Sequence, residues 1–130
     1  MGFIQRVLLA MDGSKVGKNV ALVDNRNSGS LLVQRVARIR AKKYADIRYI
    51  YQNIFSDTFR KYVDVVNTSS GIPHISSKQI NEFTMWFPSI KEQQKIADFL
   101  SAIDDKLTLE KERLEALKRY KQGLLQKMFV

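Results

Sequence analysis

The chain contains no cysteine and a single histidine, His74, among its 130 residues. The absence of cysteine excludes disulfide scaffolds, cysteine-based zinc sites and thiol catalysis. One histidine cannot by itself build a histidine-based metal site, so we expect no bound metal and no cofactor. The sequence offers no set of nucleophile, general base and carboxylate, and we therefore expect a protein that is not an enzyme on its own.

Long apolar runs and targeting signals are also absent. No apolar stretch approaches the roughly 18 residues that a transmembrane helix needs. The first 14 residues lack the basic segment and the cleavable apolar stretch of a signal peptide. We expect a cytoplasmic protein without a membrane partner.

The composition is that of a globular protein, with 45% apolar and 27% charged residues. The formal net charge is +9, and it is unevenly distributed. Residues 1–88 carry 13 basic and 6 acidic side chains, whereas residues 89–130 carry 9 and 7. The excess in the first part is typical of a surface that binds a polyanion such as nucleic acid, although a basic surface can also serve solubility alone.

The first forty residues read as short strands. Arg6–Asp12 and Asn19–Asp24 are apolar runs separated by glycines, which predicts a hairpin. Leu31–Arg40 predicts a third strand, in which Val36 and Arg38 share one face while Ala37 and Ile39 share the other.

Helical spacing of apolar residues predicts one helix over Ala45–Val66. Its aromatic side chains, interleaved with basic ones, are interpreted first as core and second as a base-stacking platform. After a break at 67–73, Ser76–Asn81 is expected to form a helical turn and Glu82–Phe87 a strand.

The clearest signal is a long helix after Pro88. Ser89 and Glu92 form a capping-box pattern, and no proline follows as far as Met128. At coiled-coil spacing, eight of ten seam positions are apolar, the exceptions being Glu110 and Lys121. We expect this seam to pack on another helix, the alternative being a helix folded back on its own domain. The apolar seam residues are Ile96, Leu100, Ile103, Leu107, Leu114, Leu117, Leu124 and Met128.

Candidate DNA contacts come from charge and loop position. The loop from Gly13 to Asn19 departs from a phosphate-binding loop in its glycine spacing and in lacking Ser or Thr at its end, so it is better interpreted as a tight turn that presents lysines. Arginines on a strand can contact phosphates or guanine edges, and amides can contact adenine. For any one of these residues, a solvated surface position is the alternative. The candidates are Lys15, Lys18, Asn19, Gln34, Arg35, Arg38, Arg40, Lys42 and Lys43.

The junction before the long helix resembles a known family. Phe87-Pro88-Ser89-Ile90-Lys91-Glu92-Gln93-Gln94-Lys95-Ile96-Ala97 is similar to the proline–Glu-Gln junction of type I restriction-modification specificity subunits, where a target recognition domain meets a spacer helix. The segment from Leu117 to Phe129 resembles the end of that helix. Asp12-Gly13-Ser14, Gln34-Arg35-Val36 and Gly71-Ile72-Pro73 also resemble the later part of such a domain. Ser89 stands where the family usually has a second proline, and serine is a good helix cap.

The resemblance implies an α+β protein with a partial α/β target recognition domain at 1–88 and a coiled-coil-type spacer and dimerisation helix at 89–130. It implies a non-catalytic subunit that reads double-stranded DNA and docks methyltransferase (modification) subunits, and restriction subunits through them. With one helix in place of the family's two, we expect a homodimer formed through the seam. The alternative is a basic, homodimeric coiled-coil module without specific DNA recognition.

Overall fold

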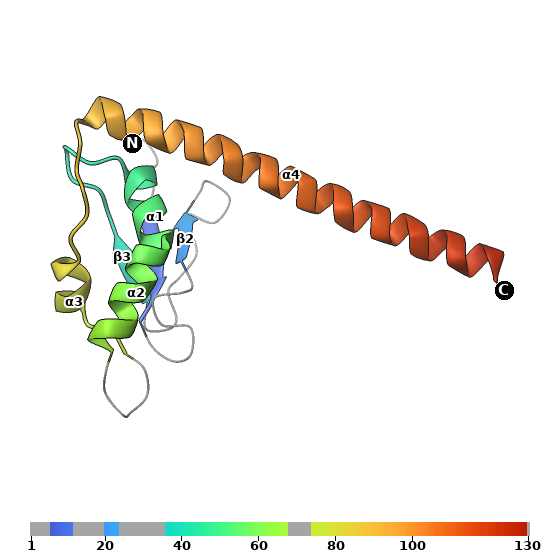
Figure 1. The fold of residues 1–130 in the computed structure, drawn as a ribbon, viewed down its shortest axis with the longest axis horizontal. Helices are drawn as coiled ribbons and strands as arrows, with labels where there is room; N and C mark the ends of the chain where they lie inside the picture. Colours follow the sequence, from blue (N-terminus) through green and yellow to red (C-terminus); the bar gives the residue numbers. More distant parts are fainter. Residues whose placement is uncertain (1–5, 12–19, 24–35, 68–73, 130) are drawn as a thin grey trace. The chain divides into compact units, whose positions relative to one another are not determined.

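The computed structural model describes residues 6–11, 20–23, 36–67 and 74–129. The chain forms two compact units, Met1–Ala97 and Asp98–Val130. No helix in the described ranges is long and apolar enough to span a membrane. The elements, labelled in Figure 1, are β1 (Arg6–Ala10), β2 (Val20–Val23), β3 (Val36–Ile39), α1 (Ile47–Phe55), α2 (Asp57–Val66), α3 (Ser77–Glu82) and α4 (Ile90–Met128).

The three strands form one antiparallel sheet in the order β2-β1-β3. The pairing of β1 with β2 confirms the predicted hairpin, and β3 confirms the described part of the third predicted strand. Because side chains alternate along a strand, Val7 and Leu9 of β1 point to one face and Arg6 and Leu8 to the other. Val7 and Leu9 are fully buried, so their face is the core face.

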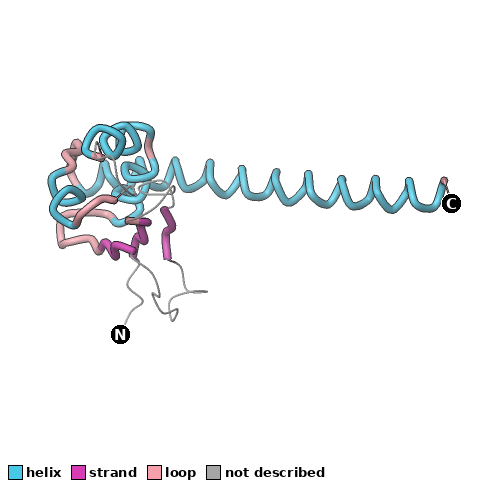
Figure 2. The backbone as a smooth tube through the Cα atoms, turned by 90° about the horizontal axis from the view of Figure 1, so that it is seen from below, coloured by secondary structure: helices cyan, strands magenta, loops and turns pink. Residues whose placement is uncertain are grey.

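The core lies between that sheet face and the short helices. Figure 2 shows the strands of the first unit along one side and its short helices on the other. The helices contribute side chains at three- and four-residue spacing, which is how an amphipathic helix covers a sheet. The buried cluster comprises Val7, Leu9, Ile47, Ile50, Ile54, Phe59, Val63 and Ile75.

The prediction of a single helix over Ala45–Val66 is wrong, because the segment forms two helices separated at Ser56. Ser56 has an extended backbone, and its side-chain oxygen accepts a hydrogen bond from the backbone N–H of Phe59. It therefore ends α1 and caps α2. Core-facing residues recur on both sides of the break, so the apolar pattern alone did not reveal it.

The helical turn predicted at Ser76–Asn81 is confirmed as α3, which opens with a complete capping box between Ser76 and Gln79. The strand predicted at Glu82–Phe87 is wrong, since the segment pairs with no strand in the described part of the chain. Phe83 packs edge-on against Phe59 instead, with ring centroids 4.9 Å apart.

The long helix is confirmed as α4, 39 residues from Ile90 to Met128. Ser89 caps it by accepting a hydrogen bond from the backbone N–H of Glu92. At about 1.5 Å per residue, α4 is roughly 58 Å long. The two compact units divide between Ala97 and Asp98, so the first two turns of α4 belong to the first unit. The functional division at 88/89 stays a prediction.

Candidate functional site

Three arginines lie on the sheet face opposite the core. Leu8 pairs with Arg38 across β1 and β3, and Val7 pairs with Ile39. Continuing this register by one residue places Arg6 opposite Arg40. Directly opposed residues of an antiparallel pair project to the same face, so Arg6, Arg38 and Arg40 share one. We call these three residues the arginine face.

The arginines of this face are close enough to repel one another. Arg38 and, next, Arg6 lower the pKa of the Arg40 guanidinium, with a smaller contribution from desolvation. Arginine nonetheless stays protonated in proteins, so losing a proton does not relieve the repulsion. The Nε atom of Arg6 is buried and, in the described part of the chain, has no hydrogen-bond partner. Such a cluster is suited to an anion that supplies acceptors and opposite charge.

The arginine face continues into a basic turn. Arg40 directly follows the end of β3, and Lys42 and Lys43 come next, both exposed. The Lys43 ammonium lies over the Tyr44 ring, 5.9 Å from its centroid. The Tyr44 side chain is itself 77% exposed. This turn adds two flexible cations beside the arginines.

The structure brings together four of the nine predicted DNA contacts, Arg38, Arg40, Lys42 and Lys43, on β3 and the turn after it. Lys15, Lys18, Asn19, Gln34 and Arg35 lie outside the described residues. Sequence analysis missed Arg6, because only strand pairing brings it next to residues more than 30 positions later. The strand alternation could have predicted this position: Arg6 comes one residue before Val7, so its side chain lies on the face opposite that of Val7.

Of the aromatic residues in the first predicted helix, Tyr49 and Phe59 are buried, which favours their interpretation as core. Phe55 is instead exposed and stacks with Tyr51. The described residues include no group of three His, Cys, Asp or Glu side chains arranged to hold a metal ion.

Gln93 connects the first turn of α4 to the rest of the first unit by hydrogen bonds. It is 1% exposed, and its amide nitrogen donates to the carbonyls of Pro88, at 2.9 Å, and Tyr44, at 3.2 Å. Its Oε1 accepts from the backbone N–H of Asp46 at 2.9 Å. Both donors and the acceptor of the amide are therefore used. The Glu-Gln motif was noted in the sequence, but this structural role was not foreseen.

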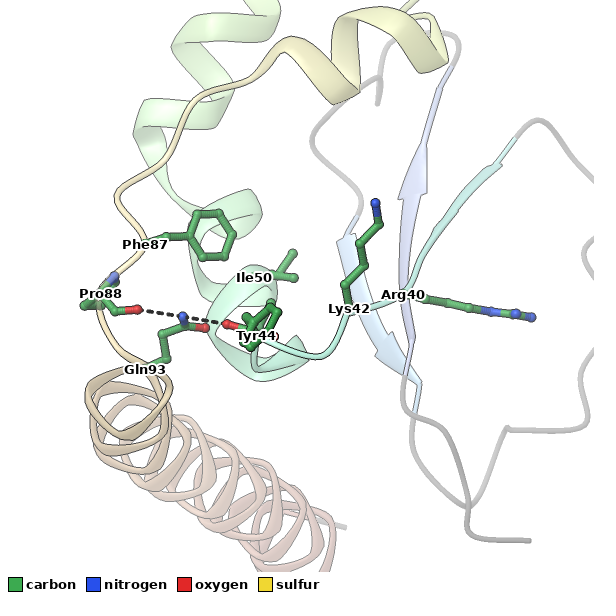
Figure 3. A pocket seen from close by; sticks show the side chains of 8 residues that line it. Arg40, Lys42, Tyr44, Ile50, Phe87, Pro88 and Gln93 are labelled. Carbon is green, nitrogen blue, oxygen red and sulfur yellow. Dashed lines mark hydrogen bonds between the residues drawn. The ribbon is translucent and has the colours of Figure 1, made fainter.

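Gln93 also lines a cavity of about 540 Å³ beside the start of α4. Figure 3 shows Tyr44, Ile50 and Phe87 around it, while the Arg40 side chain extends away from them. The Phe87 ring meets the buried Tyr49 ring at 6.1 Å between centroids. The described residues that line it are Arg40, Lys42, Tyr44, Ala45, Ile50, Phe87, Pro88 and Gln93.

In the second unit, α4 exposes its apolar side chains along its whole length. Among the predicted seam residues, Ile103 is 42% exposed and Leu117 is 65% exposed. Leu107, Leu114, Leu124 and Met128 are exposed as well, whereas Ile96 and Leu100 are half-buried. Glu110, a charged seam residue, forms a 2.9 Å ion pair with Arg113 on the same helix. Because a patch of this extent is uncommon on a monomer, it indicates an interaction surface.

The comparisons with known proteins agree with one another. A family described as "Type I restriction modification DNA specificity domain" matches residues 4–119. The chain is 27% identical over 124 residues to the type I restriction enzyme MjaVIII specificity subunit of Methanocaldococcus jannaschii, a match that covers 95% of the chain and 28% of that protein. It is 29% identical over 82 residues to the MjaIX specificity subunit of the same organism, covering 63% and 19%. The chain thus spans less than a third of the length of these relatives.

Proposed function

The chain belongs to the type I restriction modification DNA specificity family, and from this membership we propose that it reads double-stranded DNA without catalysing a reaction itself. The arginine face and the turn at Lys42 and Lys43 contact the duplex. Helix α4 is the spacer that pairs with a second helix and docks methyltransferase subunits. Through those subunits it meets the restriction subunits.

The arginine face is the observation that carries the DNA-reading role. Its three guanidiniums share one face of the sheet, and Arg38 and Arg6 depress the pKa of Arg40. The buried Nε of Arg6 has no partner within the described residues. The exposed guanidiniums of Arg38 and Arg40 can donate to phosphate oxygens and also match guanine edges bidentately. Among the described residues no carboxylate pairs with this cation cluster, and a row of cations on a sheet face favours a nucleic acid.

The test is duplex DNA binding by the Arg38→Ala plus Arg40→Ala variant at several salt concentrations. We expect affinity at low salt to fall at least about tenfold, because each charge-assisted hydrogen bond contributes roughly 1.5–3 kcal/mol. The salt slope should become shallower by about 0.9 log units for each phosphate that the variant no longer neutralises. Arg113→Ala plus Arg119→Ala, which removes two exposed arginines from α4, is the matched control and should bind like the parent. Unchanged affinity of the double variant at low salt would refute a role for the strand face.

Charge distribution supports pairing of α4 with a second copy in the antiparallel direction. Residues 98–110 carry four acidic side chains and one basic, whereas residues 111–129 carry six basic and two acidic. Antiparallel pairing places each acidic half beside a basic half, and parallel pairing would place like charges together. Glu110 and Lys121, the charged seam residues, have opposite signs and suit the same arrangement.

The double variant Leu107→Glu plus Leu114→Glu tests the pairing. Four buried carboxylates per dimer would oppose association strongly, so we expect a monomer by light scattering. The control, Leu109→Glu plus Gln122→Glu, makes the same charge change away from the seam and should stay dimeric. A double seam variant that remains dimeric would rule out the seam as the interface.

A second experiment separates the proposal from the alternative of a coiled-coil module with no specific DNA role. The chain is mixed with the methyltransferase subunit of the same system, with and without duplex DNA, and analysed by size-exclusion chromatography with light scattering. A stable complex supports the specificity-subunit role. A dimer that binds neither the methyltransferase subunit nor a particular DNA sequence favours the alternative.

A further inference from the structure

The cavity beside Gln93 has an apolar centre that neither DNA reading nor helix pairing uses, although Arg40 and Lys42 at its edge are also proposed DNA contacts. It has a volume of about 540 Å³, and its walls are formed mostly by Tyr44, Ala45, Ile50, Phe87 and Pro88. Tyr44 and Phe87 are 77% and 51% exposed, so they present aromatic surface to solvent. A concave apolar site with exposed aromatic side chains has the character of a binding hot spot.

The charges at this cavity limit what can occupy it. Its two charged lining residues, Arg40 and Lys42, are both cations, and Lys43 stands over the Tyr44 ring beside them. Within the described ranges, no carboxylate lines the cavity. A basic rim around an apolar centre is complementary to an acidic segment that carries an apolar side chain.

Two other occupants fit less well. The basic half of a second copy's α4, residues 111–129, carries six basic and two acidic side chains and would be repelled by the rim. The acidic half, residues 98–110, is already paired with a basic half in the proposed antiparallel dimer. Duplex DNA supplies negative charge, but its grooves offer little apolar surface beyond the thymine methyl group. Neither matches both the concave apolar centre and the basic rim.

We propose that this cavity binds an acidic segment of the methyltransferase subunit that inserts an apolar side chain between Tyr44 and Phe87. The proposal rests on the proposed function, because it gives the docked subunit a second contact on the first unit. Lys42 and Lys43 pair with the acidic flank of the segment. The Gln93 side chain is already fully hydrogen-bonded, so it forms a wall of the cavity and is not a ligand.

The reporter is tyrosine labelled with fluorine. The chain has five tyrosines, and Tyr44→Phe assigns the Tyr44 ¹⁹F resonance, as Tyr120→Phe assigns that of Tyr120 on α4. Addition of unlabelled methyltransferase subunit is expected to shift or broaden both resonances. Lys43 is a proposed DNA contact and lies over the Tyr44 ring, so duplex DNA is expected to shift the Tyr44 resonance as well, and the methyltransferase subunit is therefore added without DNA.

Two variants measure the energetic contribution. Tyr44→Ala should weaken methyltransferase binding at least tenfold, as expected for an aromatic hot spot. Val65→Ala, at a 70% exposed position on α2, is the control and should bind like the parent. Lys42→Glu should weaken binding more at low salt than at high salt, and the exposed Lys61→Glu should not.

Each outcome separates this proposal from the function on which it rests. Movement of both resonances, with loss of affinity in Tyr44→Ala, supports the cavity as a docking site. Movement of Tyr120 alone, with Tyr44→Ala binding normally, overturns the cavity proposal and leaves docking on α4 intact. Movement of Tyr44 with DNA but not with the methyltransferase subunit assigns the cavity to the DNA interface and overturns the proposal. Absence of any complex overturns methyltransferase docking and the cavity proposal together.

Discussion

The two units of this chain use apolar residues in opposite ways. In the first unit, Val7, Leu9 and Phe59 are completely buried between a small sheet and short helices. In the second unit, a single helix exposes Leu107, Leu117 and other large apolar residues. The first unit encloses its own core, whereas the second exposes apolar side chains on one long helix. The contrast teaches that apolar content alone does not reveal where a core will form.

The contrast extends to the polar residues. Gln93 is buried in the first unit and makes three hydrogen bonds to backbone groups. The ion pairs of the second unit, Glu110 with Arg113 and Glu115 with Lys118, are exposed and join residues one turn apart. Buried polar contacts fix a unique arrangement, whereas exposed pairs add only small increments to helix stability.

The largest expected difference in stability is between alanine variants of a buried and an exposed phenylalanine. Phe59→Ala should lower the free energy of unfolding by about 3–5 kcal/mol, because the side chain is fully buried and leaves a cavity. Phe99→Ala, at a 67% exposed position of α4, should change it by less than about 0.5 kcal/mol. Urea denaturation followed by circular dichroism measures both. Equal losses would show that α4 is buried to the same degree as the core.

The next comparison uses two neighbouring glutamines. Gln93→Ala should cost about 2–3 kcal/mol, because it removes three part-buried hydrogen bonds to backbone groups of Asp46, Tyr44 and Pro88. Gln94→Ala is the control, since Gln94 is exposed, and should be neutral within about 0.5 kcal/mol. Gln93→Glu should also destabilise, because a carboxylate cannot donate to the two carbonyls. If Gln93→Ala left the free energy of unfolding unchanged, other contacts would have to hold the start of α4 against the first unit.

A smaller effect is expected at a helix cap. Ser56→Ala removes the side-chain oxygen that caps α2 and should cost about 1 kcal/mol in thermal or urea unfolding. Ser56→Asp, which keeps a capping oxygen, is the matched control and should retain most of the stability. If Ser56→Ala were fully neutral, the break between α1 and α2 would have to be fixed by packing alone.

The smallest effect belongs to the surface of α4. Glu110→Gln removes the ion pair with Arg113 and should change the stability of the helix by about 0.2–0.5 kcal/mol. The difference should shrink in high salt, because exposed charges are screened. Helix content followed by circular dichroism in low and high salt checks this. The measurement is made in the monomeric Leu107→Glu plus Leu114→Glu variant, because Glu110 is a seam position in the proposed dimer. A loss above about 1 kcal/mol in that background would contradict a purely local ion pair.

The elements that could be predicted from the sequence are those that a local residue pattern specifies. The long helix is specified by Ser89, an uninterrupted run without proline and a periodic apolar seam, all of which are local signals. The hairpin followed from two apolar runs around a glycine-containing loop. The resemblance at the Glu-Gln junction supplied the family, which the match over residues 4–119 confirmed.

Prediction from the sequence failed for features that are determined by contacts between residues distant in the chain. Burial alternates over residues 82–86, since Phe83 and Met85 are half-buried while Thr84 and Trp86 are exposed, but Phe87 is exposed as well. The side chains pack against helices instead of a neighbouring strand, so an extended segment forms without a sheet. Arg6 and Gln93 were missed for a related reason, because their partners are distant in sequence.

The division of labour between the two units can be tested most directly by hydrogen exchange with mass spectrometry, with and without duplex DNA. We predict that DNA slows amide exchange in peptides that cover β1, β3 and the turn at Lys42 and Lys43. Peptides from the second unit, residues 98–129, should exchange at the same rate in both samples. Protection confined to residues 98–129, with none at β1 or β3, would contradict the assignment of DNA reading to the arginine face.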